Sequence, residues 1–410
     1  MTPNRAPHSH DLLSLESLNS ISAPYYQRFE LTAPIDALSI LKDISHTPFV
    51  YWCSRDGNSE FVGIGLAEPH YSSVSQAQHR LATLPYPLRA FGGCAFSKQS
   101  DGWGHFGQER FWIPKIVYGR VQNQYFIQHC ILSDQPVQTK PSAQLHPHET
   151  IPSLQDWVHH IEASYREFSA GTLKKIVLAR QLQLHIPMHP IDALRALRKQ
   201  QTASFDFAFS PFGTDCFLGC SPELLFSIQG QQIHTEALAG TRPRESNPEE
   251  LLHSEKDHRE HQFVTAHILK QLEPLCQDVH HSPQPMISTH NHVIHLKTKI
   301  EGNLHQNSDV AQLIAMLHPT PAVCGLPKNR ALQKIEELEG FDRGWYAGPV
   351  GWIGKDEAEF AVGIRSALFS KKSYSVWAGA GIVEGSKAQQ EWQEIETKSR
   401  QFLLLSTEKI

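Results

Sequence analysis

The 410-residue sequence lacks the features that mark several classes of protein. No apolar run approaches the roughly 18 to 20 residues that span a bilayer, and the start MTPNRAPHSHDLL has no apolar core of a secretory signal. Seven cysteines, an odd number with no CxxC pair, indicate neither a disulfide framework nor a zinc ribbon. We therefore expect a cytoplasmic protein without a membrane partner, whose cysteines are reduced and buried.

Strong charge of one sign is also absent. The 37 Lys and Arg residues nearly balance the 42 Asp and Glu residues, which leaves a net charge of -5 and no basic footprint for nucleic acid. The 25 histidines are numerous, but most stand in polar or proline-rich surroundings. His258 and His261 have no third ligand at a diagnostic spacing, so we expect surface histidines and not a histidine metal centre.

The chain divides by composition at a polar, proline-bearing segment, residues 133 to 153. Residues 1 to 24 are polar and expected to be loose, and residues 25 to 132 read as short strands and turns, with a hairpin around Asp56-Gly57-Asn58. Beyond the segment, strands alternate irregularly with helices predicted at 154 to 169, at 191 to 200 and from Ser254 onward. This order indicates an α+β protein with mainly antiparallel sheets.

The stretch LKKIVLARQLQL, residues 173 to 184, predicts a strand that is apolar on both faces yet begins with two lysines. Lysines commonly flank a strand where it emerges into water. Alternation along a strand nevertheless puts Lys175 on the face of Val177 and Ala179, so its ammonium would lie along a packed sheet face. A desolvated lysine loses its proton more easily and becomes a usable base.

Carboxylates form two further patterns. In the last predicted helix, Glu391, Glu394 and Lys398 lie at i, i+3 and i+7, within about 60 degrees of arc. This face fits two interpretations, and the pattern leaves both open. One is an exposed ion pair between Glu394 and Lys398, and the other is a carboxylate pair that binds a divalent cation such as Mg²⁺. Glu223 follows a Ser-Pro step and precedes an apolar strand. Two interpretations stay open: an ordinary carboxylate at the edge of the strand, or a general acid with a raised pKa.

Two glycine-bearing segments need an explanation. GAGIVEG, residues 379 to 385, resembles a dinucleotide-binding turn, but its GxGxxxG spacing and the short remainder of the chain argue against that site. We expect close approach of its backbone to a ligand. EALAGTRPR, residues 236 to 244, predicts a tight Gly-Thr turn that is either only a turn or a cradle for an anion. Two further polar residues are candidates for a functional site. They are Glu260, on the inward stripe of its helix, and Arg365, which follows an apolar strand.

Nine ordered motifs resemble those of the chorismate-utilising enzymes, and most of all the isochorismate synthases. The motifs are KIVLAR, SPELLF, LAGTRPR, SEKDHREH, LHPTPAVCGLP, FDRGWYAGPVGW, GIRSAL, WAGAGIV and EWQEIETK. They cover residues 154 to 405, while residues 25 to 132 resemble the family more loosely, through YWCSRDG and RAFGG. The resemblance implies the fold of anthranilate synthase component I: one catalytic domain over residues 25 to 410, with two stacked antiparallel sheets, helices outside, and the site between the sheets.

The same resemblance implies a role for each matching residue. Lys175 would be the base that activates water, and Glu223 the acid that protonates the leaving hydroxyl. Glu260 and Glu394, with Glu391 close by, would bind the Mg²⁺ ion that holds the ring carboxylate of chorismate. The implied substrate contacts are Tyr346, Arg365 and Gly379 for the enolpyruvyl carboxylate, and Gly240, Thr241, His295, Ala322 and Lys398 elsewhere in the pocket.

Lys175 argues for water as the nucleophile, because the ammonia-using relatives do not carry this lysine. The aminodeoxychorismate synthases also usually have a nucleophilic lysine where this chain has Ala239. The implied reaction is the reversible, magnesium-dependent conversion of chorismate to isochorismate, without an obligatory glutamine amidotransferase subunit. We expect it to serve menaquinone synthesis. The alternatives are isochorismate supply for a siderophore and a salicylate synthase that goes on to eliminate pyruvate.

Overall fold

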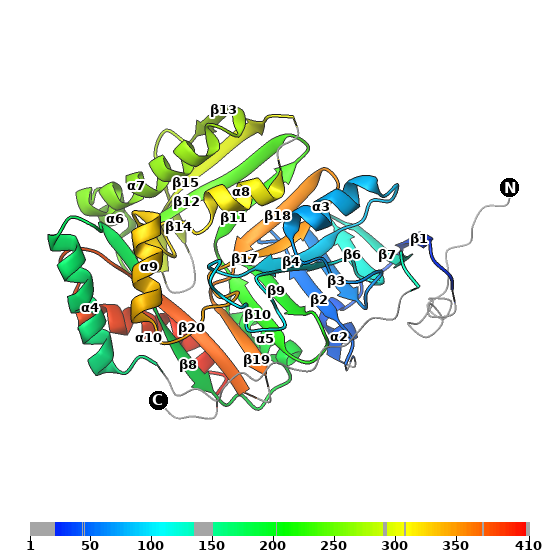
Figure 1. The fold of residues 1–410 in the computed structure, drawn as a ribbon, viewed down its shortest axis with the longest axis horizontal. Coiled ribbons are helices and arrows are strands. Elements are labelled where there is room, and N and C mark those ends of the chain that lie inside the picture. Colours follow the sequence, from blue (N-terminus) through cyan, green and yellow to red (C-terminus); the bar gives the residue numbers. More distant parts are fainter. Residues whose placement is uncertain are drawn as a thin grey trace.

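The computed structural model describes residues 21–42, 44, 46–134, 151–201, 203–289, 293–306, 309–370 and 373–406. Within these ranges two antiparallel sheets pack through a shared apolar core, and helices lie on the outside (Figure 1). The predicted α+β fold with mainly antiparallel sheets is confirmed. The predicted linker lies mostly outside the described residues, and the division into domains stays a prediction.

The larger sheet joins the two parts of the chain that composition distinguishes. Its strand order is β1 (Tyr25–Leu31), β7 (Gln124–Ile131), β6 (Ile116–Val121), β3 (Ser59–Ile64), β2 (Phe49–Cys53), β9 (Phe205–Ser210), β10 (Cys216–Ser221), β19 (Ser366–Ser370), β20 (Ser373–Ile382), β8 (Lys175–Leu184) and β16 (Gly325–Leu326). β2 and β3 form the predicted hairpin. Because β2 also pairs with β9, the N-terminal strands continue the sheet that carries β8.

The smaller sheet contains the segment in which a turn was predicted. Its order is β13 (Cys276–His281), β15 (Val293–Leu304), β12 (Gln232–Pro243), β11 (Leu224–Gln229), β18 (Glu357–Val362), β17 (Pro349–Ile353), β4 (Ala90–Cys94) and β5 (Glu109–Trp112), with β14 (Met286–Thr289) beside β15. The predicted Gly-Thr turn is wrong, because LAGT lies inside β12. Gly240, with φ +71°, forms a bulge where the ladder to β15 shifts register, a conformation that glycine adopts without strain.

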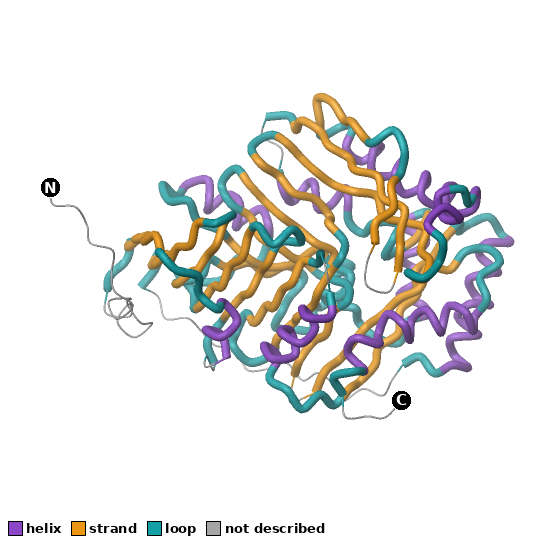
Figure 2. The backbone as a smooth tube through the Cα atoms, turned by 180° about the vertical axis from the view of Figure 1, so that it is seen from behind, coloured by secondary structure: helices purple, strands orange, loops and turns teal. Residues whose placement is uncertain are grey.

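The helices cover the sheets from outside and along their rim (Figure 2). They are α2 (Ala37–Lys42), α3 (Val74–Thr83), α4 (Leu154–Ser169), α5 (Pro190–Gln200), α6 (Pro248–Leu252), α7 (Glu255–Leu272), α8 (Val310–Leu317), α9 (Lys328–Leu338) and α10 (Ala388–Leu403). The predicted helices correspond to α4, α5 and α7, and the Ser254 hydroxyl caps α7 by accepting the backbone N–H of Asp257. In the part of the chain that is described, no helix is both long and apolar enough to cross a membrane.

Aromatic side chains fill the space between the sheets. Trp103, from the N-terminal part, stacks on Trp377 of β20 with ring centroids 4.9 Å apart. Tyr346 stacks on the same Trp377 indole, with ring centroids 5.8 Å apart. Such pairs contribute beyond the apolar area that they bury. All seven cysteines are free and buried, as predicted.

A buried ion pair completes the outer edge of β8. β20 pairs with most of β8 on one side, but β16 pairs with only its first two residues on the other. Beyond β16, the Glu339 carboxylate accepts the backbone N–H of Ala179 at 2.6 Å, and the Arg343 guanidinium donates to the carbonyl of Val177 at 2.8 Å. These side chains therefore supply hydrogen bonds that a further strand would otherwise make.

Arg343 and Glu339 also form an ion pair with each other. Nε of Arg343 donates to Glu339 at 2.7 Å, and another guanidinium nitrogen donates to the carbonyl of Val323 at 2.9 Å. Their side chains are only 3% and 2% exposed. A buried charge left without its partner is costly, so the two residues depend on each other.

We predict that Arg343→Met lowers the free energy of unfolding by about 3–5 kcal/mol, because it leaves the Glu339 charge buried and unpaired. Urea denaturation followed by circular dichroism measures this loss. Arg330→Met is the matched control, since Arg330 of α9 pairs with Glu167 of α4 and has a third of its side chain exposed, and a much smaller loss is expected. Equal losses in the two variants would contradict the role of the buried pair.

Candidate active site

A cavity of about 260 Å³ collects most of the predicted site residues. Its lining comes from β8 and β20 of the larger sheet, from β12 and β15 of the smaller sheet, from α7 and α10, and from connections between strands and helices. Eleven of the thirteen predicted residues line it: Lys175, Glu223, Gly240, His295, Ala322, Tyr346, Arg365, Gly379, Glu391, Glu394 and Lys398. The side chains of the other two, Thr241 and Glu260, lie outside the described residues.

Lys175 enters the cavity from the first position of β8 and is 9% exposed. Val177 lines the same cavity, as the alternation along the strand predicts. The side chain of Lys175 extends over Gly381 of the neighbouring strand, where an added Cβ would lie 3.1 Å from Cε and 3.5 Å from Nζ of the lysine. The glycine-rich segment therefore makes room for the lysine, and Gly379 and Gly381 lie within β20 and not in a nucleotide-binding turn.

Glu223 reaches the cavity from the connection between β10 and β11. Its backbone N–H donates to the Ser221 hydroxyl at 3.3 Å, which helps to fix the connection. Burial, with a smaller effect from the charge of Glu236, raises the pKa of Glu223 to about 7, although Lys175 and Lys398 act in the opposite direction. A substantial fraction of Glu223 is thus protonated at neutral pH, as a general acid requires.

The cavity-facing side of α10 shows both arrangements that the spacing left open. Nζ of Lys398 lies 2.7 Å from the Glu394 carboxylate, so the ion pair forms. Glu391 and Glu394 nevertheless both line the cavity. Burial disfavours the charge of Glu394, but Lys398, with smaller effects from Lys175 and Arg365, outweighs burial and holds the pKa of Glu394 below its ordinary value. Glu394 therefore remains ionised at neutral pH.

The magnesium site stays a prediction. Among the residues that the structure describes, no three His, Cys, Asp or Glu side chains form a group that could hold a metal ion. The donor chemistry still fits, because Mg²⁺ is commonly bound through only one or two carboxylates, with waters and substrate completing its coordination. Glu391 and Glu394 offer such carboxylates to the cavity.

Arg365 and Tyr346 form a further polar part of the lining. Nη1 of Arg365 donates to the carbonyl of Lys398 at 3.1 Å, and its backbone has φ 52° in the connection between β18 and β19. Burial raises the pKa of Tyr346, so its hydroxyl remains a neutral donor. An added Cβ on Gly379 would lie 3.2 Å from that hydroxyl, which shows how closely β20 approaches it.

Aromatic contacts hold α10 in position over the sheet. Nε1 of Trp157, from α4, donates to the carbonyl of Ala388 at the start of α10 with a length of 3.1 Å. The guanidinium of Arg180, from β8, lies 3.9 Å from the ring centroid of Trp392. α10 is thus tied to the strand that carries Lys175.

Sequence reasoning missed several residues of the cavity, among them Asp257, Trp377 and Gly381. Each lies inside a segment quoted for the family resemblance, two or three positions from a residue to which a role was assigned. Asp257 lies beside the bulge in β12, where an added Cβ on Gly240 would be 3.2 Å from its own Cβ. Only the fold brings these neighbours to the cavity.

The family described as Chorismate binding enzyme matches residues 16–405 of the chain. The chain belongs to this family. It is 32% identical over 403 residues to isochorismate synthase MenF of Escherichia coli (strain K12), a match that covers 90% of each chain. It is also 35% identical over 410 residues to the salicylate biosynthesis isochorismate synthase of Pseudomonas aeruginosa, covering 88% of this chain and 86% of the relative.

Solved structures agree with this assignment. The structure of MenF, described as the menaquinone-specific isochorismate synthase from Escherichia coli, superposes with a TM-score of 0.84 at 30% identity and covers 95% of this chain and 97% of its own. Anthranilate synthase component I from Streptococcus pneumoniae superposes with a TM-score of 0.65 at 18% identity, covering 97% of this chain and 95% of its own, and shows the shared fold alone. The predicted fold is therefore confirmed.

We predict that infrared difference spectra of the protein contain a protonated carboxyl band that disappears as the pH rises through about 7. The raised pKa of Glu223 keeps the proton below this pH, and the proton is lost above it. Glu223→Gln identifies the band by removing it. A Glu223 band that is already absent at pH 6 would contradict the effect of burial on this carboxyl.

Proposed function

We propose that the protein is an isochorismate synthase that converts chorismate reversibly to isochorismate. The observation that carries this proposal is that Lys175 and Glu223 line one cavity, one from the start of β8 in the larger sheet and the other from the connection before β11 in the smaller sheet. Addition of water at one ring carbon and loss of a hydroxyl at another require a base and an acid at two separate positions. The family and its isochorismate synthase relatives support the same reaction.

In the proposed mechanism, Lys175 in its uncharged form takes a proton from the attacking water. A C–O bond then forms next to the carboxylate-bearing ring carbon, the ring double bonds shift, and the C–O bond to the original hydroxyl breaks. Glu223 gives its proton to that oxygen, which leaves as water. One water enters and one departs, so the product is an isomer, and the reverse reaction exchanges the roles of Lys175 and Glu223.

The remaining lining residues fit the carboxylates of the substrate. The planar guanidinium of Arg365 is suited to a carboxylate, and we assign it with Tyr346 and the backbone at Gly379 to the enolpyruvyl group. Glu260 and Glu394 would hold Mg²⁺, with Glu391 close by, and Glu391 and Glu394 both line the cavity. When bound, the ion would neutralise the ring carboxylate and fix its position.

We propose menaquinone synthesis as the pathway, supported by the likeness to MenF over nearly the whole chain. Supply of isochorismate for a siderophore is the alternative use of the same product. The cytoplasmic location and the lack of an amidotransferase subunit stay predictions.

Incubation with chorismate and Mg²⁺, followed by identification of the product, tests the function. We expect isochorismate, and an equilibrium mixture of the two compounds when isochorismate is supplied instead. Salicylate with pyruvate would identify a salicylate synthase, and unchanged chorismate would contradict both assignments.

We predict that Lys175→Ala and Glu223→Gln each lower kcat by about 10²–10⁴-fold, because each removes one of the two proton transfers. Circular dichroism and Mg²⁺ titration calorimetry are expected to show a folded protein that still binds the ion. Gly340→Ala is a suitable control, since an added Cβ there would meet only Ile151 at 3.9 Å. Normal turnover in either of the first two variants would refute the assigned role.

A further inference from the structure

A second, much smaller cavity adjoins Glu223. Its volume is about 10 Å³, at the lower limit of what holds a single water molecule. Glu236 and Thr235 of β12 and Thr320, after α8, line it together with Glu223. Its other lining residues are the apolar side chains Leu224, Leu225, Leu238, Val264, Ile268 and Leu317. Two carboxylate residues thus share a small, mostly apolar space, although the proposed mechanism uses only one of them.

Two cations fix the charge of Glu236. The residue is 6% exposed, and Arg55 donates to both of its carboxylate oxygens, with Nη2 at 2.8 Å from Oε2. Lys297, from the adjacent strand β15, forms a further ion pair with it. Burial disfavours the charge of Glu236, but Arg55 and Lys297 outweigh burial and lower its pKa. Glu236 is therefore a permanent negative charge beside Glu223.

Arg55 connects this charge to the backbone of the acid. Its Nη1 donates to the carbonyl of Pro222 at 3.0 Å, directly before Glu223. Arg55 stands in the turn between β2 and β3, within the YWCSRDG segment, and Asp56 and Glu359 add negative charge around it. The N-terminal part of the chain thereby contributes to the surroundings of the acid.

The charges around Glu223 oppose one another. Lys398 from α10 and the hydroxyl of Thr320 favour its ionised form, as does Lys175 from β8 whenever it carries its proton. α7 and α8 present only apolar side chains to the small cavity, among its described lining residues. Glu236 is the negative group that acts against the two lysines. Without it, only burial would oppose these groups, and the pKa of Glu223 would fall.

We propose that Glu236, held in its charged form by Arg55 and Lys297, is a positioning residue that keeps the proton on Glu223 across the small cavity they share. This inference rests on the proposed role of Glu223 as the acid. Glu236 itself does not line the main cavity, so it acts on the reaction only through Glu223.

The test is the infrared titration of the Glu223 carboxyl in the full-length protein without substrate. In Glu236→Gln we expect the band to titrate lower by on the order of one pH unit, so that the protonated fraction at pH 7 falls from about half to about a tenth. Glu236→Asp keeps the charge and is expected to restore the titration. Because this readout needs no turnover, it is independent of whether the protein makes isochorismate.

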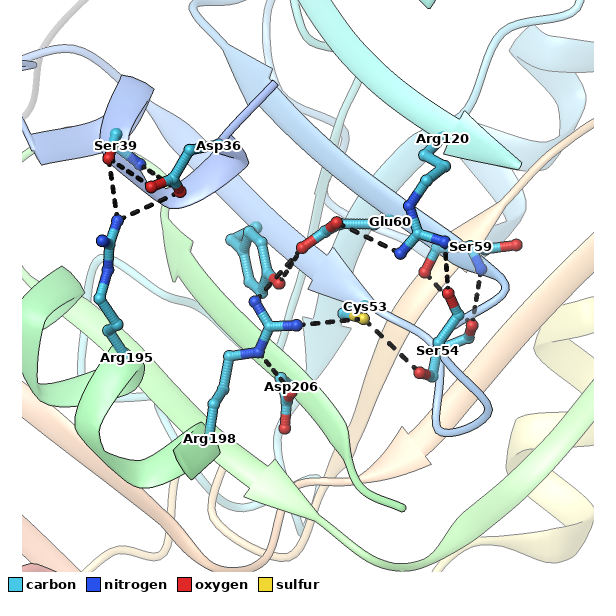
Figure 3. Close-up of polar contacts among 12 residues, drawn as sticks. Asp36, Ser39, Cys53, Ser54, Ser59, Glu60, Arg120, Arg195, Arg198 and Asp206 are labelled. Atoms are coloured by element: carbon cyan, nitrogen blue, oxygen red, sulfur yellow. Dashed lines mark hydrogen bonds and ion pairs between the residues drawn. The ribbon is translucent and has the colours of Figure 1, made fainter. Parts of the chain in front are cut away.

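Asp206→Asn is the matched control. Asp206 is a similarly buried carboxylate, 7% exposed, and pairs with an arginine, Arg198, at 2.8 Å (Figure 3). It lines neither cavity, so its removal is expected to leave the Glu223 titration unchanged. If Glu236→Gln does not fold, the double variant Glu236→Gln/Lys297→Gln removes one charge of each sign. It should shift the titration in the same direction, because Glu236 and not Lys297 lines the small cavity.

An unchanged Glu223 titration on loss of the Glu236 charge would overturn the proposal. An equal shift in Asp206→Asn would also overturn it, because the effect would then follow from the loss of any buried ion pair. Failure of Glu236→Asp to restore the titration would show that the shape of the side chain, and not its charge, matters.

Discussion

The site depends on the position of one strand edge, and a buried ion pair holds that edge. β8 has a full partner on one side only, so Arg343 and Glu339 bond the backbone of Val177 and Ala179 where a further strand would otherwise do so. Lys175 begins this strand and faces the cavity. A strand fixed by side chains can remain rigid while its end opens to a substrate. The fold thus gives the proposed base a defined place without closing the cavity.

The second requirement is a carboxyl that keeps its proton near cationic groups. Glu223 meets it through burial and through the negative charge of Glu236. That charge is in turn held by Arg55, which lies 181 residues away in sequence. The N-terminal strands therefore do more than extend the two sheets, because one of their turns reaches the surroundings of the acid. This connection gives a physical reason for the N-terminal part and the motif-bearing part to form one structure.

Sequence alone predicted the features that depend on local pattern. Alternation put Lys175 and Val177 on one face, and capping residues gave the start of α7 correctly. The family resemblance supplied eleven of the residues that line the cavity. The prediction of a turn at Gly240 was wrong because turns and bulges both favour a glycine with positive φ, and the sequence is the same in either case. Only the pairing with β15 distinguishes the two. Glu236 was missed because a glutamate in a polar, alternating strand resembles a surface residue until Arg55 and Lys297 cover it.

The central claim is that Lys175 activates water, which then becomes the new ring hydroxyl. Turnover of chorismate in H₂¹⁸O, sampled early and analysed by mass spectrometry, tests it most directly. The account predicts isochorismate with one ¹⁸O atom in its new hydroxyl group, and no such product from Lys175→Ala. Unlabelled isochorismate would contradict it, because the hydroxyl would then have moved within the substrate and no water would have been activated.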